Sequence, residues 1–126
     1  MPLSIIHVED DPDIREIAAM ALEFAGDYDL VQFEDGASCL RGLGDLVPDV
    51  FLLDMMMPGM DGLTLLGELR ARPSHASVPI IFMTARVQKS ELQPLLDAGA
   101  IGIIEKPFEP IELGARIETL LAGRTT

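Results

Sequence analysis

The sequence predicts a three-layer α/β sandwich, in which five helices cover both faces of a five-stranded parallel sheet. Short apolar segments alternate five times with segments whose apolar residues recur at helical spacing. One short segment, residues 50–53, consists of four bulky apolar residues, the composition of a strand buried on both faces. Strict alternation with right-handed crossovers favours the sandwich, whereas spacing alone leaves the strand order open.

The first half of the chain contains two strand–helix units. The expected elements are a strand over 3–8, a helix over 12–25, a strand over 28–33 and a helix that follows Asp35-Gly36 and contains Cys39. Pro12 suits the first turn of a helix, where its missing N–H has no partner to lose, and Asp11 is then the natural N-cap.

The second half contains three further units. The expected elements are a strand ending on Asp54, a helix carrying Leu65, Leu66 and Leu69, a polar loop over 72–75, a strand over 78–83, a helix from Ser90 to about Ala98, a strand over 101–104 and a helix opened by Pro110. Pro58-Gly59 forces a turn and Asp61 is a good N-cap. Ser90 as N-cap places Pro94 in a first turn, and Leu95 either packs inward or belongs to a docking face with Glu105.

Composition restricts the classes of function. Residues 1–122 are expected to form one domain and 123–126 a flexible tail. Nine basic against 21 acidic residues give a net charge of −12, which argues against direct nucleic-acid or anionic-membrane binding. Apolar runs too short for a bilayer, the lack of a secretion signal and a single cysteine together predict a cytoplasmic location.

Polar residues end four of the expected strands: Glu9-Asp10, Asp54, Thr84 and Lys106. Parallel strands bring these ends to one edge of the sheet, so three carboxylates, a hydroxyl and an ammonium would share one site. Clustered carboxylates need a cation, and hard oxygen ligands suit Mg²⁺. The Asp54 carboxylate could then act as a nucleophile toward phosphorus, although taken alone Asp54 could equally cap a turn.

Several spaced motifs resemble the receiver domain of bacterial two-component response regulators. They are Val8-Glu9-Asp10, Leu53-Asp54, Met57-Pro58-Gly59-Met60-Asp61-Gly62, Thr84-Ala85, Gly99-Ala100 and Lys106-Pro107-Phe108. The resemblance covers residues 3–121 and implies a flavodoxin-like fold with strand order 2-1-3-4-5. It implies a single-domain response regulator, a signalling protein rather than a classical enzyme.

The resemblance also implies roles for individual residues. Asp54 would accept a phosphoryl group from a sensor histidine kinase or histidine phosphotransferase. Asp10, Asp54 and the backbone carbonyl of Met56 would bind Mg²⁺, with Glu9 acting through water. Thr84 and Lys106 would hold the phosphoryl group, and Lys106-Pro107 would be a cis peptide.

Two features of the sequence affect the expected output of the switch and the lifetime of its phosphorylated form. Many receivers carry an aromatic switch residue where this chain has Ile103, so the switch is expected to depend on Thr84 and on the fourth helix. Met56 and Arg86 flank the expected path of water to the phosphorylated aspartate. The Met56 thioether cannot orient a water as a carboxamide or carboxylate can, and Arg86 has only donors and cannot accept the water's proton, so slow autodephosphorylation is expected. The signal would pass to a protein target or a relay partner.

Other side chains are interpreted structurally. His7 is expected to be buried and hydrogen-bonded, His75 solvent-facing, and Cys39 a small core residue. Met55, Met56, Met57 and Met60 are read as loop packing plus a carbonyl ligand rather than as a copper site, and Asp11 as a helix cap rather than a third metal ligand.

Two functions compete with the phosphorylated switch. A pseudo-receiver would keep the fold without phosphorylation, which the intact acidic, hydroxyl and lysine positions oppose. A phosphatase would need a second acid near Asp54, which Met55-Met56-Met57 do not supply, and a flavin carrier would retain colour on purification.

Overall fold

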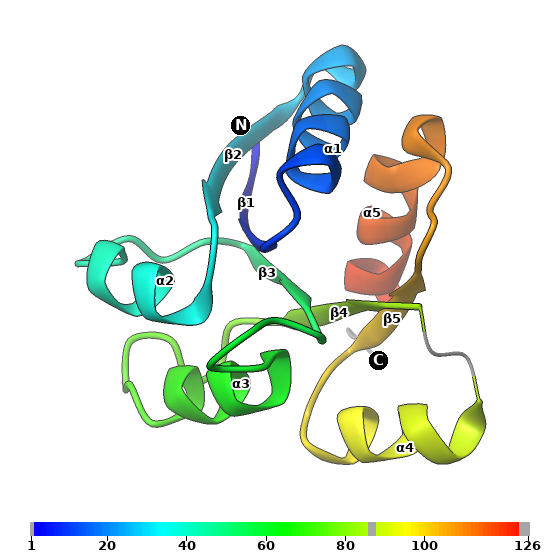
Figure 1. The fold of residues 1–126 in the computed structure, drawn as a ribbon. Helices are drawn as coiled ribbons and strands as arrows, with labels where there is room; N and C mark the ends of the chain where they lie inside the picture. The colour runs from blue at the N-terminus through cyan, green and yellow to red at the C-terminus, as the bar shows by residue number, and fades with distance from the viewer. Residues whose placement is uncertain (1, 86–87, 124–126) are drawn as a thin grey trace.

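A five-stranded parallel sheet forms the centre of the molecule, in the order β2-β1-β3-β4-β5 (Figure 1). The computed structural model describes residues 2–85 and 88–123. The strands are β1 (Leu3–Val8), β2 (Tyr28–Phe33), β3 (Val50–Asp54), β4 (Ile80–Thr84) and β5 (Gly102–Glu105). The flavodoxin-like strand order implied by the resemblance is confirmed, and β1, β3 and β4 occupy the middle of the sheet.

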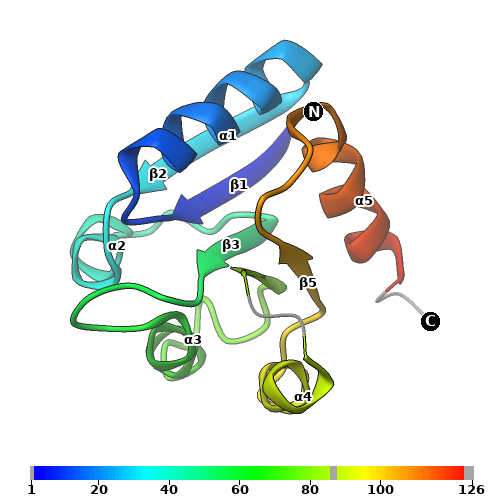
Figure 2. The ribbon, with the colours of Figure 1, turned by 45° about the vertical axis from the view of Figure 1, so that its right-hand side comes forward.

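Helices cover both faces of this sheet, as the turned view in Figure 2 shows. They are α1 (Pro12–Ala25), α2 (Gly36–Gly42), α3 (Gly62–Arg70), α4 (Lys89–Asp97), the short 3₁₀ helix η1 (Pro110–Glu112) and α5 (Leu113–Gly123). One apolar core joins α1 and α5 to the sheet, and a second joins α2, α3 and α4 to its other face. Along β3 every residue from Val50 to Asp54 is buried, as predicted for a strand covered on both sides.

Aspartate side chains cap the first turns of three helices, and those of Asp11 and Asp61 do so as the sequence predicts. Asp11 Oδ1 accepts a hydrogen bond from Asp13 N at 2.9 Å, and Asp61 Oδ1 accepts one from Thr64 N at 2.8 Å. Asp35 Oδ1 accepts from Ser38 N at 2.7 Å. Each bond satisfies an amide that the first turn of a helix would otherwise leave without a partner. Gly26 ends α1 with a φ of 94°, a conformation that glycine adopts without strain.

The fourth and last helices begin differently from the prediction. Helix α4 starts at Lys89 after Gln88, which makes no side-chain capping bond, so the expected Ser90 cap is wrong. Pro94 consequently lies inside the helix rather than in its first turn. Pro110 opens the short η1 helix, and α5 itself begins at Leu113. Single-residue caps are weak local signals, which packing of the apolar face overrides.

Two side chains are more buried than the sequence indicated. His75 was expected to face solvent, but it is buried, with its Nε2 2.8 Å from the carbonyl oxygen of Leu46 and its ring 6.0 Å from that of Phe51. Leu95 also packs into the core, which rules out the docking-face alternative for its side chain. Among the described residues, none of the helices combines the length and the apolar character that a membrane span requires.

Candidate functional site

Three carboxylates converge at the carboxyl ends of β1 and β3. The two strands are direct neighbours, with Val8 paired to Leu53, so the residues that follow them come together. One oxygen from each of Glu9, Asp10 and Asp54 lies within 4.8 Å of the others. Glu9 and Asp54 are buried, whereas Asp10 is half-buried. The predicted acidic cluster is therefore present, at the crevice outside the strand ends where open α/β sheets bind ligands.

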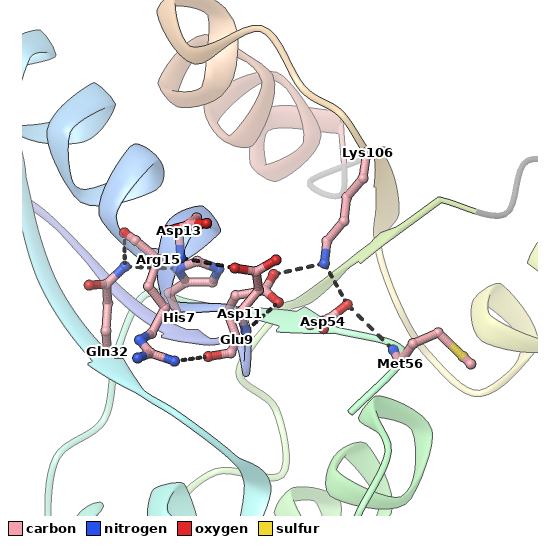
Figure 3. Close-up of polar contacts among 9 residues, drawn as sticks. All are labelled: His7, Glu9, Asp11, Asp13, Arg15, Gln32, Asp54, Met56 and Lys106. Atoms are coloured by element: carbon pink, nitrogen blue, oxygen red, sulfur yellow. Dashed lines mark hydrogen bonds and ion pairs between the residues drawn. The ribbon is translucent and has the colours of Figure 1, made fainter. Parts of the chain in front are cut away.

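Lys106 brings the opposite charge into this cluster. Its Nζ donates a hydrogen bond to Asp54 Oδ1 at 2.8 Å and lies 2.8 Å from Glu9 Oε1 (Figure 3). The backbone places the side chain there, because Lys106 N donates to the carbonyl oxygen of Thr84 at 2.9 Å immediately after β5. The following peptide bond, Lys106-Pro107, is cis, as the resemblance implied.

Burial and charge shift the ionisation of these groups. Burial raises the pKa of Glu9 to about 7; the Lys106 ammonium opposes this rise, and the Asp54 carboxylate adds to it. Burial by itself would lower the pKa of Lys106, but Asp54 and Glu9 together hold that pKa above its ordinary value. The lysine is therefore a fixed positive charge beside carboxylates that repel one another.

The loop after β1 is held by contacts that the sequence analysis did not identify. Arg15 Nη1 donates to the carbonyl oxygen of Glu9 at 2.7 Å, and Asp11 N donates to Glu9 Oε2 at 3.3 Å (Figure 3). Arg15 lies one turn into α1, a position from which its side chain reaches back over the loop. An arginine four residues after the N-cap Asp11 was the only available signal, and it is too common on helices to indicate such a contact.

His7 lies on β1 before this loop and does not belong to the group of side chains that gather at the acidic cluster. It is fully buried, and its Nδ1 lies 3.0 Å from Gln32 Nε2, which also donates to the carbonyl oxygen of Arg15 at 2.9 Å. Burial lowers the pKa of His7 to about 3, with the positive charges of Lys106 and Arg15 acting in the same direction. The prediction of a buried, hydrogen-bonded histidine is confirmed.

The loop after β3 shapes the other side of the site. Met56 N donates to Asp54 Oδ1 at 3.4 Å, and Gly59 turns the chain with a φ of 77°. Gly62 then packs so closely that a Cβ atom there would lie 2.5 Å from the backbone oxygen of Asp54. The methionines of this loop differ in exposure. Met57 is buried, as predicted for a packing residue, whereas Met56 is 57 % exposed.

Comparison with known proteins decides the family. Residues 5–118 match the family model of the response regulator receiver domain. This chain belongs to the response regulator receiver family. The receiver domain is a phosphoacceptor switch in two-component signalling, so the resemblance drawn from the motifs is confirmed.

Curated relatives are longer than this receiver. The DNA-binding response regulator MtrA of Mycolicibacterium smegmatis is 37% identical over 117 residues, covering 93% of this chain and 50% of MtrA. The phosphate regulon protein PhoB of Escherichia coli is 36% identical over 121 residues, covering 96% of this chain and 52% of PhoB. The chain thus spans about half the length of the curated relatives it matches.

Solved receivers share the fold closely. Chemotaxis protein CheY4 of Vibrio cholerae superposes with a TM-score of 0.87 at 26% identity, covering 95% of this chain and 99% of CheY4. The receiver domain of the sensor histidine kinase PA1611 from Pseudomonas aeruginosa gives 0.83 at 28% identity, covering 97% and 99% of the two chains. The PA1611 receiver was solved with a magnesium ion coordinated in its active site cleft.

The acidic cluster of this receiver fits a small hard cation. Its donors are all carboxylate oxygens, the ligand type that Mg²⁺ prefers. Glu9 Oε1 is buried and, among the described residues, has no partner in hydrogen-bonding geometry, although it lies close to the Lys106 ammonium. A buried carboxylate oxygen that lacks a hydrogen-bond partner favours binding of a further cation.

The remaining predicted residues occupy different depths of the site. Thr84 is buried at the end of β4, beside β3, and lines with Met56 a hollow of about 260 Å³. Ile103 is half-buried on β5 and packs against the core beneath α3 and α4. Arg86 lies outside the described residues.

Proposed function

We propose that this receiver is a single-domain response regulator that accepts a phosphoryl group on Asp54. The donor is the phosphohistidine of a sensor histidine kinase or of a histidine phosphotransferase. The observation that carries the proposal is the Lys106 ammonium, which lies 2.8 Å from Asp54 Oδ1 inside a cluster of three carboxylates. An ammonium in that position suits a ligand that brings further negative charge, such as a phosphoryl group.

The reaction is assigned to the oxygens of Asp54. Lys106 and the Met56 amide hold Oδ1, so we assign Oδ2 as the oxygen that attacks phosphorus. The new phosphorus–oxygen bond forms as the bond from phosphorus to the donor histidine breaks. Lys106 and Thr84 then hold the oxygens of the transferred group, whose charge the ammonium partly offsets.

Mg²⁺ is the proposed cofactor. Asp10, Asp54 and the backbone carbonyl of Met56 would hold the ion directly, and Glu9 would act through water. The ion supplies positive charge that offsets the repulsion between the phosphoryl oxygens and the carboxylates. Arg15 supports this arrangement from outside, because its bond to the Glu9 carbonyl holds the loop that carries both Glu9 and Asp10.

We propose that the output of this receiver is an interaction with another protein. Residues 1–122 would act as one receiver unit that binds a protein target or passes the phosphoryl group to a relay partner. The net charge of −12 opposes direct contact with DNA by this chain, so the DNA binding named for MtrA stays a property of that relative. A cytoplasmic location, slow autodephosphorylation and a flexible tail at 123–126 stay predictions.

Intact-mass spectrometry after incubation with Mg²⁺ and acetyl phosphate tests the proposal. Wild-type protein should gain the mass of one phosphoryl group, and Asp54→Asn should gain none, because a carboxamide is a poor nucleophile. Asp45→Asn is the matched control, since Asp45 is exposed and its charge change is the same. Equal phosphorylation of the wild type and Asp54→Asn would refute Asp54 as the acceptor, and no uptake by the wild type would favour a pseudo-receiver.

A further inference from the structure

Exposure separates the methionines of this receiver into distinct groups. Met20 on α1 is 62% exposed and Met56 is 57% exposed. Met83 and Met57 are buried, and Met55 and Met60 are half-buried. Oxidation of a thioether depends on access of the oxidant to sulfur. Among the described methionines, a dissolved oxidant should therefore reach Met20 and Met56 first.

Only one of these two exposed methionines lies beside the phosphoacceptor. The Met56 amide is 3.4 Å from Asp54 Oδ1, and Figure 3 shows its side chain extending away from the Asp54–Lys106 pair. That side chain lines the 260 Å³ hollow together with Met55, Thr84, Glu91, Leu92 and Leu95. The hollow is large enough for several water molecules, at about 30 Å³ each. Met20 instead lines a separate apolar groove between α1 and η1.

We propose that Met56 is a redox-sensitive modification site whose oxidation shortens the lifetime of the phosphorylated receiver. The inference rests on the proposed phosphorylation of Asp54. The oxidant is a hydroperoxide: its terminal oxygen bonds to the Met56 sulfur as the O–O bond breaks. Sulfur loses two electrons and becomes a sulfoxide, and the peroxide is reduced to an alcohol, or to water from hydrogen peroxide, which keeps the proton.

Oxidation changes how strongly the Met56 side chain can accept a hydrogen bond from water in the hollow. A thioether sulfur is a weak hydrogen-bond acceptor and holds no water in place. A sulfoxide oxygen is strongly polar, so it can accept a hydrogen bond from a water molecule in the hollow that Met56 shares with Thr84, the residue proposed to hold the phosphoryl oxygens. An oriented water attacks the acyl phosphate faster, and one such hydrogen bond should speed hydrolysis about tenfold. Oxidation at Met20 should leave the lifetime unchanged.

The test combines oxidation mapping with phosphate decay. Wild type, Met20→Leu and Met56→Leu are treated with dilute hydrogen peroxide, and fragment-ion mass spectrometry locates the added oxygen within the Met55-Met56-Met57 peptide. Each protein is then phosphorylated with acetyl phosphate, and the decay is compared before and after oxidation. Oxygen should appear on Met56 before Met55 or Met57, and decay should quicken about tenfold in wild type and Met20→Leu. Met56→Leu should show no change on oxidation.

A methionine sulfoxide reductase provides the reversal, and should restore slow decay in the oxidised wild type. Preferential oxidation of Met55 or Met57, or equal decay before and after oxidation of Met56, would overturn the inference while leaving Asp54 phosphorylation intact. Failure of the unoxidised protein to take up phosphate would instead refute the proposed function and, with it, the inference built on it.

Discussion

Lys106 Nζ lies 2.8 Å from Asp54 Oδ1, although 51 residues separate the two in the sequence; Asp54 is the last residue of β3, and Lys106 directly follows β5. The ammonium also lies 2.8 Å from Glu9 Oε1, so one cation is shared between carboxylates at the ends of different strands. A phosphoryl group on Asp54 would meet this ammonium without rearrangement of the lysine.

Binding of Mg²⁺ with beryllofluoride, a phosphoryl mimic, should raise the melting temperature of the wild type. A ligand that binds only the folded state stabilises it by mass action. Asp54→Ala should lose the response to both ligands. Asp10→Ala should lose the response to metal while Asp54 is still present. Differential scanning fluorimetry measures all three proteins, and equal thermal shifts in them would contradict the site assignment.

Amide exchange should change most across residues 84–108 when beryllofluoride binds. Without an aromatic side chain at Ile103, the response should run through Thr84 at the end of β4 and through α4, which has no side-chain cap at its start. A helix that begins without such a cap has a less stable first turn. Hydrogen–deuterium exchange with and without beryllofluoride measures this, with α1 as the internal reference. A flat response over 84–108 would mean that the switch lies elsewhere or is absent.

The phosphorylated form should decay faster in the double mutant Met56→Asn with Arg86→Glu than in the wild type. A carboxamide and a carboxylate can orient an attacking water, which the native side chains do not do. One positioned hydrogen bond corresponds to roughly ten- to a hundredfold in rate, on the order of 1.4–2.7 kcal/mol of barrier. Loss of phosphoprotein in Mg²⁺ over time is the measurement. Unchanged decay would mean that water access does not determine the lifetime.

The Cys39 thiol should resist alkylation in the folded protein and make stability depend on alkaline pH. Burial raises the pKa of Cys39 from about 9 to about 12. Between these values the unfolded chain releases the thiol proton while the folded chain keeps it, so the free energy of unfolding falls as pH rises. From about pH 8 to about pH 10 this loss should be about 1 kcal/mol larger in wild type than in Cys39→Ala, by urea denaturation. An identical loss in both proteins would contradict the burial of the thiol.

Two glycines of α3 should respond in opposite directions to alanine. A Cβ at Gly62 would lie 2.5 Å from the backbone oxygen of Asp54 and 3.0 Å from Met55 Cα, so Gly62→Ala should cost about 1–3 kcal/mol and disturb the acceptor loop. Gly67 has no atom within 4 Å of such a Cβ, so Gly67→Ala should stabilise the protein by about 0.4–1 kcal/mol. Chemical denaturation of the two variants compares them directly, and destabilisation by both would contradict the packing described for Gly67.

The sequence by itself determined the elements and the chemistry of the site. Alternation of strand and helix patterns predicted the sandwich, because an apolar face can be buried only against a neighbouring layer. Asp11 and Asp61 predicted two helix starts, since each cap acts on amides two or three residues away. Acidic, hydroxyl and lysine residues at the strand ends predicted one shared cluster, because parallel strands end at the same edge.

Only the tertiary structure decided what depends on contacts between distant residues. The fold buries His75 against Leu46 and Phe51, and it places Arg15 on the carbonyl of Glu9. Neither contact has a local signal, because a polar loop or a helical arginine looks the same in the sequence whether or not a partner segment covers it. The shared position of the Lys106 ammonium between Glu9 and Asp54 is of the same kind, since it requires the ends of β1, β3 and β5 to meet in space.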